Sequence, residues 1–208
     1  MNNDISADFP AYLAAEIRAR MQADIPISWL QGCTGDVRAN ITKRPGLRKP
    51  AAFLLSLIYG SPFVADCSID QIKSMVKPLA ARIASAPYQP LALDDSSAAR
   101  SASSVLRDRS GNTYELPLYF AELGGGFRIL GFGGEPFSQY DTELRREFAS
   151  LWVLGYTNEL LGYIPTDEAC EKGGYEPGKG NERYGIAAPF EPGTENHLLE
   201  SARRLIRA

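Results

Sequence analysis

Two stretches of sequence decide the fold of this chain and its candidate site: Gly133-Gly134-Glu135-Pro136-Phe137 and Gly155-Tyr156-Thr157-Asn158-Glu159-Leu160-Leu161-Gly162-Tyr163-Ile164-Pro165-Thr166. Each lies at the end of an apolar run, where a strand would give way to a loop. Glu135 in the first stretch and Tyr163 in the second present oxygen donors at these strand ends. Together they predict half of a metal site.

Length and composition are those of an ordinary globular protein. The chain has 208 residues, of which 44% are hydrophobic, and a formal net charge of −3. This size suits a single domain with a buried core. Lysines and arginines are scattered among acids, so no basic face for nucleic acid is expected.

The sequence predicts neither a transmembrane segment nor a leader. No apolar run reaches the roughly 18–20 residues that a membrane-spanning helix needs. The first residues, Met1-Asn2-Asn3-Asp4, lack the basic and apolar regions of a signal peptide. We therefore expect a cytoplasmic protein as written, while a complete parent protein could be secreted.

Cysteine and histidine usage argues against thiol chemistry. Cys33, Cys67 and Cys170 are widely spaced and form no CxxC pair, so a disulfide framework or a structural zinc knot is not expected. A catalytic cysteine normally needs a histidine base. The single histidine, His197, is expected on the surface of the last helix.

The spacing of apolar residues predicts helices in the first half of the chain. Those over residues 8–23 and 68–86 each carry an apolar face, and residues 51–59 are a shorter candidate. The expected core stripe of the second helix consists of Ile72, Met75, Val76, Leu79 and Ile83. A short strand is predicted over 25–30, and it leads into a glycine-bearing loop over 31–40.

The second half of the chain is predicted to be strand-rich. Residues 96–104, rich in serine and alanine, predict a flexible excursion, and Pro117 places its strand at a sheet edge. The patterns then predict strands and helices, in order, over 105–109, 113–122, 127–132, 136–150, 152–156 and 195–205. Glu135 would face the positive end of the helix over 136–150.

Helices interspersed with short strands indicate an α/β fold, a layered domain with mixed β-sheets and flanking helices. We expect one domain over residues 1–208. It should be helix-rich over 1–95, flexible over 96–104, and strand-rich with the metal-site motifs over 105–208.

Four motifs occur together in the chain: Gly35-Asp36-Val37-Arg38-Ala39-Asn40, Gly134-Glu135-Pro136-Phe137, Thr157-Asn158 with Gly162-Tyr163-Ile164-Pro165-Thr166, and Gly173-Gly174-Tyr175-Glu176. In order and rough spacing they resemble the neutral/alkaline non-lysosomal ceramidase family, specifically the C-terminal half of its catalytic domain in a bacterial-type protein. The resemblance covers almost the whole chain. It implies that the domain is an incomplete half of a larger catalytic domain.

The resemblance implies a zinc-dependent amidohydrolase that cleaves an N-acyl amide of a lipid-like, sphingolipid-type substrate such as ceramide. In that family two histidines, a glutamate and a tyrosine hold Zn²⁺; by motif position, Glu135 and Tyr163 match the last two. Zinc lowers the pKa of its bound water to about 7 and polarises a carbonyl group. The glycine-bearing loop supplies the implied substrate-binding residues, which are Gly35, Asp36, Arg38 and Asn40.

The chain departs from the family's pattern in two places. Arg38 and Ala39 occupy the positions of a serine and a proline in the family's loop, and the arginine's fixed charge suits an anionic part of a substrate. The catalytic residue at the serine position is therefore unassigned. Both histidine ligands belong to the N-terminal half of the family's domain, and His197 matches neither.

Three interpretations follow from these departures. The chain is a truncated or split gene product, inactive alone; or it is a subunit that pairs with a separate N-terminal-half chain supplying the two histidines. Alternatively, it is a non-catalytic domain in which Glu135 caps the following helix and Tyr163 packs beneath it. As a half domain it should also expose apolar surface where the missing half would pack.

Overall fold

The structure, a computed structural model, describes residues 8–37, 68–87 and 97–208. Their contacts divide the chain into two compact units. We call the first the helical unit (8–29 and 68–87) and the second the sheet unit (30–37 and 97–208). Each is described by itself, so the expectation of one domain over 1–208 stays a prediction.

The helical unit consists of α1 (Asp8–Met21) and α3 (Ile69–Ser85), which confirms both predicted helices. The helix over 51–59 lies outside the described residues. Ser68 caps α3 in a capping box with Gln71, which satisfies free N–H groups of the first turn. The buried contact between the helices is formed by Leu13, Ile17, Val76 and Ala80.

Part of the stripe predicted for α3 is not core. Ile72 and Val76 pack toward α1, but three of the predicted residues are 41–44% exposed: Met75, Leu79 and Ile83. A helix of 17 residues with apolar side chains over much of its surface can bury one face only against a single partner helix.

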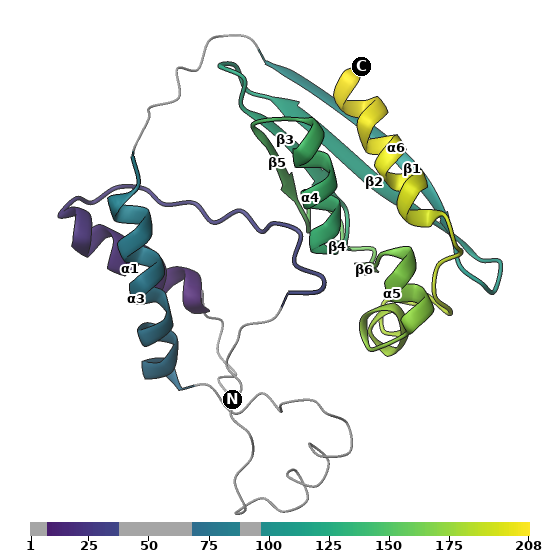
Figure 1. The fold of residues 1–208 in the computed structure, drawn as a ribbon, viewed down its shortest axis with the longest axis horizontal. Helices are drawn as coiled ribbons and strands as arrows, with labels where there is room; N and C mark the ends of the chain where they lie inside the picture. The colour runs from purple at the N-terminus through teal and green to yellow at the C-terminus, as the bar shows by residue number, and fades with distance from the viewer. Residues whose placement is uncertain (1–7, 38–67, 88–96) are drawn as a thin grey trace, which may run out of the picture. The chain divides into compact units, whose positions relative to one another are not determined.

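The sheet unit is built on four strands in the order β1-β2-β3-β5 (Figure 1). These are β1 (Ala98–Arg107), β2 (Thr113–Glu122), β3 (Arg128–Phe132) and β5 (Leu151–Leu154). The pairs β1–β2 and β2–β3 are antiparallel, whereas β3–β5 is parallel. A separate parallel ladder joins β4 (Glu135–Pro136) to β6 (Tyr163–Ile164).

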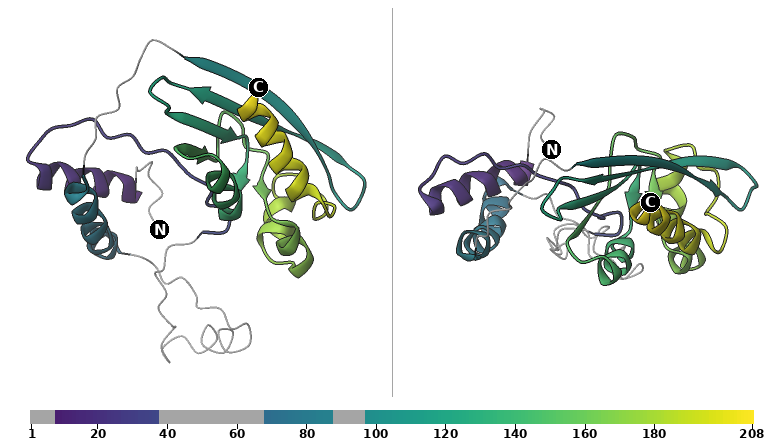
Figure 2. Two further views of the ribbon diagram at one scale, coloured as in Figure 1. Left: turned by 45° about the horizontal axis from the view of Figure 1, so that its top comes forward. Right: turned by 90° about the horizontal axis from the view of Figure 1, so that it is seen from above.

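Helices cover one face of this sheet. They are α4 (Ser138–Glu147) and α6 (Thr194–Arg207), which lie on the same side of the strands (Figure 2). The remaining elements are α5 (Asp167–Lys172) and η1 (Glu176–Gly180). The predicted fold class, a layered α/β arrangement with a mixed sheet and flanking helices, is confirmed. No helix within the described ranges is long and apolar enough to span a membrane.

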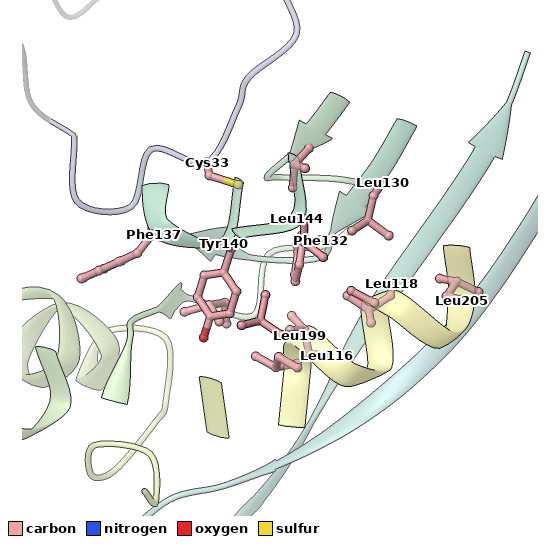
Figure 3. Close-up of a cluster of buried hydrophobic side chains, with 14 of the residues drawn as sticks. Cys33, Leu116, Leu118, Leu130, Phe132, Phe137, Tyr140, Leu144, Leu199 and Leu205 are labelled. Carbon is pink, nitrogen blue, oxygen red and sulfur yellow. The ribbon is translucent and has the colours of Figure 1, made fainter. Parts of the chain in front are cut away.

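The core lies between the covered sheet face and the two helices. Along β2 the buried residues alternate with more exposed ones, as a strand with one covered face requires. Tyr140 and Leu144 of α4 meet sheet residues such as Phe132, and Leu199 and Leu205 reach in from α6 (Figure 3). Burial of this kind is the main stabilising term of the unit.

Two predictions for strands are wrong. Residues 25–30 form no strand; the chain makes a single ladder bridge farther on, between Gly32 and Leu154. Residues 98–104, predicted as flexible, form most of β1. Their small side chains give little periodic signal, but pairing with β2 and packing against α6 order them.

Pro117 does not place β2 at an edge, because β2 lies between β1 and β3. The proline sits just beyond the paired end of β3, where it accepts a hydrogen bond from the N–H of Gly133 (2.9 Å). The ladder needs no donor from β2 at that position, so the missing N–H costs nothing.

Candidate functional site

Glu135 and Tyr163 face each other directly in the β4–β6 ladder. Paired residues in a ladder project their side chains to the same face, so the two predicted ligands are neighbours in space. The ladder is anchored on both sides of the pair. The N–H of Glu135 donates to the carbonyl of Gly162 (2.7 Å), and the N–H of Phe137 donates to the carbonyl of Ile164 (3.1 Å).

Asn181 holds Tyr163 in this position. Its side-chain oxygen accepts from the N–H of Tyr163 (2.8 Å), and its side-chain nitrogen donates to the carbonyl of the same residue (3.0 Å). The amide therefore takes the place of a neighbouring strand along β6. Asn181 is 1% exposed, so its side of these bonds is shielded from water.

Phenol groups surround the Glu135 carboxylate. Tyr184 donates its hydroxyl to Oε1 of Glu135 (2.9 Å), and its ring meets the ring of Tyr163 edge-on at 6.1 Å between centroids. Tyr175 meets Tyr163 on a similar edge, at 6.3 Å. The four tyrosines 156, 163, 175 and 184 with Glu135 form what we call the tyrosine cluster.

The carboxylate changes the acidity of its phenol neighbours. The hydrogen bond to Glu135, together with some burial, raises the pKa of Tyr184 to about 12. Partial burial raises the pKa of Tyr156, and the adjacent Glu135 carboxylate raises it further. Glu135 contributes to both shifts because ionising a phenol beside a carboxylate would bring two negative charges together. Both groups are consequently neutral hydrogen-bond donors at ordinary pH.

Glu135 is a buried carboxylate that has no cationic neighbour in the described part of the chain. The residue is 6% exposed. In the described part of the chain its side chain interacts with phenols and forms no ion pair. Burying a carboxylate is costly unless a positive charge compensates it, so this position suits a bound cation.

The glycine-bearing loop also reaches this site. The N–H of Gly35 donates to the carbonyl of Pro136 (3.0 Å), so the loop runs along β4. Asp36 accepts from the N–H (2.7 Å) and the hydroxyl (2.9 Å) of Ser138, at the first turn of α4. Arg38 and Asn40, the other two predicted substrate-binding residues, lie outside the described residues.

The carboxylate at the start of α4 is therefore that of Asp36, not Glu135. The helix begins at Ser138, two residues later than predicted, and Glu135 lies in a strand. Asp36 supplies the hydrogen-bond acceptor that the N-cap residue Phe137 lacks. This contact was not foreseeable from sequence, because it joins positions about a hundred residues apart.

Substituting Gly35 with alanine is expected to lower the free energy of unfolding by about 1–3 kcal/mol. A Cβ there would lie 2.4 Å from the backbone oxygen of Glu135, so loop and strand would have to separate. Urea denaturation measures the change. Gly32→Ala in the same loop is the control, because its Cβ would meet nothing nearer than 3.8 Å. Equal stability of the two variants would show that the close approach is unimportant.

The donors present fit part of a metal centre. One carboxylate and one phenol are oxygen ligands for a divalent cation, and zinc sites of the catalytic kind accept such donors. Among residues 8–37, 68–87 and 97–208, no three His, Cys, Asp or Glu side chains come together. His197 is exposed on α6 as predicted and bonds Ser104 (3.0 Å between Nε2 and Oγ), not Glu135.

Comparison with known proteins supports the fold. No protein-family model and no curated protein sequence matches the chain. Among solved structures, the crystal structure of neutral ceramidase from Pseudomonas aeruginosa is similar, with a TM-score of 0.59 and 14% sequence identity over 98% of this chain. The fold is ceramidase-like. The chain covers 41% of the length of that neutral ceramidase, so the similarity concerns one part of a larger protein.

Sequence reasoning found the two facing residues of the ceramidase-like fold but missed their supports. The structure places Glu135 opposite Tyr163 and runs the loop of Gly35 and Asp36 along β4, and the roles of these four residues remain predictions. Tyr156, Tyr184 and Asn181 were not predicted as site residues. Tyr156 lies within residues 155–166, but nothing in a single sequence marks its left-handed backbone (φ 54°) or its closeness to Glu135.

Proposed function

We propose that this chain carries two ligands of a zinc-dependent amidohydrolase centre that hydrolyses the N-acyl amide of a lipid-like, sphingolipid-type substrate. The observation that carries the proposal is the direct pairing of Glu135 with Tyr163 in the β4–β6 ladder. The buried Glu135 carboxylate, which has no cationic neighbour among the residues the structure describes, supports it, and so does the ceramidase-like fold. Zinc held there would activate water and polarise the amide carbonyl.

The residues of this chain have defined tasks in such a centre. Glu135 would supply a charged ligand, and Tyr184, through its 2.9 Å hydrogen bond, fixes the direction of that carboxylate. Tyr163 would supply a neutral or ionised phenol. Arg38, at the position of the family's serine, would bind an anionic part of the substrate, which favours an N-acyl amide that carries a negative group over ceramide itself.

The centre needs two more ligands, which we propose come from a separate chain bearing two histidines. The sheet unit supports a partner of this kind, because no element of its described part covers the face opposite α4 and α6. That face exposes Val105 (55%) and Trp152 (51%), and Phe127 stacks edge-on against Trp152 at 5.6 Å. An open apolar face of this kind is typical of an interaction surface.

In zinc titrations by calorimetry, the isolated chain is expected to show weak binding without tight one-to-one stoichiometry, because two oxygen donors do not complete a zinc site. Glu135→Gln should abolish even that weak binding. Glu159→Gln is the matched control, since Glu159 is an exposed acid that bonds Tyr119. Tight zinc binding by the isolated chain would reveal a ligand that the proposal omits.

The activity itself is tested with the partner. If a gene beside this one encodes a chain with two histidine motifs, the mixed chains are expected to bind one zinc per pair and to release fatty acid from N-acyl amides, and Glu135→Gln should abolish both. Arg38→Ala should reduce turnover of substrates with an anionic group and leave neutral ones unchanged. A mixture that binds no zinc would indicate a non-catalytic domain.

A further inference from the structure

The outer edge of β1 is an unusually regular, open strand edge. β1 is the first strand in the sheet order, and it runs for ten residues paired with β2 along one side only. Its sequence contains no proline or lysine, and its register with β2 is continuous, without a bulge. Natural edge strands usually carry such devices, because an open edge invites pairing with another strand.

Four residues of β1 present both backbone groups at this edge: Ala99, Ser101, Ser103 and Val105. Arg107 shows which alternate residues of β1 point outward. Its carbonyl accepts from the N–H of Glu191 (2.9 Å) and so points away from β2. Antiparallel pairing alternates, so every second residue before Arg107 points the same way. Within the described residues, none of the outward backbone N–H and C=O groups of these four residues is hydrogen-bonded.

The edge already accepts a strand at its far end. Residues 189–191 lie alongside the end of β1 and the two residues that follow it. The N–H of Arg109 donates to the carbonyl of Pro189 (2.9 Å), and Asp108 forms an antiparallel bridge with Phe190. The pairing stops at Glu191, because Pro192 and Gly193 turn the chain into α6. The geometry of the edge is thus suited to a longer partner strand.

The margin of α6 beside this edge carries the positive charge of Arg204. Ser104 of β1 bonds His197 (3.0 Å) and Ser201 (3.3 Å), and Arg204 donates to Ser201 (3.1 Å), so these three α6 residues form one stripe next to β1. Arg204 is exposed. Glu200, the one acid between His197 and Arg207, is paired with Arg203 at 2.8 Å and so does not neutralise the stripe.

We propose that the outer edge of β1 docks an extended peptide segment with acidic side chains, which adds a strand to the sheet. Backbone groups of Ala99, Ser101, Ser103 and Val105 would form the ladder, and carboxylates on the α6 side of the guest strand would meet Arg204 and His197. The small side chains of Ser101 and Ser103 leave room for larger residues of the guest on the other face.

A second copy of this chain is a poorer occupant. A two-fold axis on β1 would place two α6 margins side by side, and each would bring its Arg204 toward the other's arginine. Like charges across an interface are unfavourable. An acidic segment instead meets charges of opposite sign.

The test measures amide hydrogen exchange along β1 in the whole chain, with a synthetic peptide of alternating valine and glutamate as the probe and one of alternating valine and lysine as its control. In the free chain the amides of Ala99, Ser101, Ser103 and Val105 should exchange fast, while those between them are protected by β2. The glutamate peptide is expected to slow the four by at least about tenfold, and the lysine peptide should not.

Two variants locate the site. Ser103→Pro removes an outward N–H without breaking the β1–β2 ladder, so it should abolish protection by the peptide while Ala102 and Ser104 stay protected. Arg204→Glu should weaken binding of the glutamate peptide about tenfold, and Arg145→Glu on α4 should not. If Ser103→Pro fails to fold, the comparison of Arg204→Glu with Arg145→Glu still tests the proposal.

Three outcomes would overturn the proposal. The first is that the glutamate and lysine peptides slow exchange of the four amides equally, or that neither peptide slows it. The second is unchanged binding in the Arg204→Glu variant. The third is protection of the four amides in the absence of peptide that rises with protein concentration together with a dimer mass in light scattering, because it would make the occupant a second copy.

Discussion

Replacing Asn181 with alanine is expected to lower the free energy of unfolding of the sheet unit by about 2–5 kcal/mol. The substitution removes both side-chain bonds to the backbone N–H and C=O of Tyr163, a half-buried residue. Each unsatisfied group costs its full desolvation energy, and the truncated side chain adds a cavity. Chemical denaturation followed by circular dichroism measures the loss.

The matched control for this variant is Asn196→Ala, because Asn196 is exposed on α6. It should stay within about 0.5 kcal/mol of the parent chain. A second readout separates the site from general stability: in Asn181→Ala, the aromatic NMR signals of Tyr163 and Tyr184 should move more than those of Tyr12 in the helical unit. An Asn181→Ala chain as stable as the Asn196→Ala control would contradict the role of Asn181 in holding Tyr163.

Replacing Asp108 with alanine is expected to cost about 3–5 kcal/mol near neutral pH. The Asp108 carboxylate is fully buried and closes the β1–β2 hairpin. It accepts from the N–H groups of Ser110 and Asn112 (both 2.9 Å), from the Asn112 side chain (3.1 Å) and from the hydroxyl of Tyr114 (2.9 Å). Alanine leaves these donors without their acceptor.

The effect of this substitution should depend on pH. Burial by itself would raise the pKa of Asp108, but the hydrogen bonds from Asn112, Tyr114 and Ser110 outweigh it and lower the pKa below its ordinary value. A lowered folded-state pKa stabilises the fold fully above the ordinary carboxyl pKa, near 4, and the stabilisation is lost as pH falls through the lower folded value. The stability gap between the parent chain and Asp108→Ala should therefore narrow in acid.

Glu115→Gln is the control for Asp108→Ala, because Glu115 is an exposed acid of the same hairpin that makes one long bond to Ser103 (3.4 Å). Its stability should follow the parent chain at every pH. A gap between the parent and Asp108→Ala that stays constant down to strongly acid pH would show that the ionised form of the carboxyl does not hold the turn.

Local patterns in the sequence predicted many of the helices and strands of the fold. Helical spacing predicted α1, α3 and α6, and the turn at residues 110–112 predicted the β1–β2 hairpin. The predictions that failed concern segments whose structure depends on contacts with residues far away in sequence. The serine- and alanine-rich start of β1 has almost no pattern of its own, and Pro117 fits a central strand only because β3 ends beside it.

The candidate site also has residues that local motifs predict and residues that only long-range contacts bring in. Motifs identified Glu135 and Tyr163, since their positions in apolar stretches and their resemblance to a known family were both local properties. Asn181, Tyr184 and the capping role of Asp36 depend on which loops pack together. A buried asparagine or a loop tyrosine is common in any chain, so neither stands out until the contacts of the fold are known.

The β4–β6 ladder also has a consequence for the order of folding. Glu135 and Tyr163 belong to segments separated by α4 and β5, so they meet only when that whole stretch has folded back onto the sheet. A contact that closes so long a loop carries an entropic cost, which nearby packing must offset first. We therefore expect the ladder to form late in folding, after the β1–β2 hairpin. When the core is destabilised, the pairing of Glu135 with Tyr163 should be the first contact to be lost.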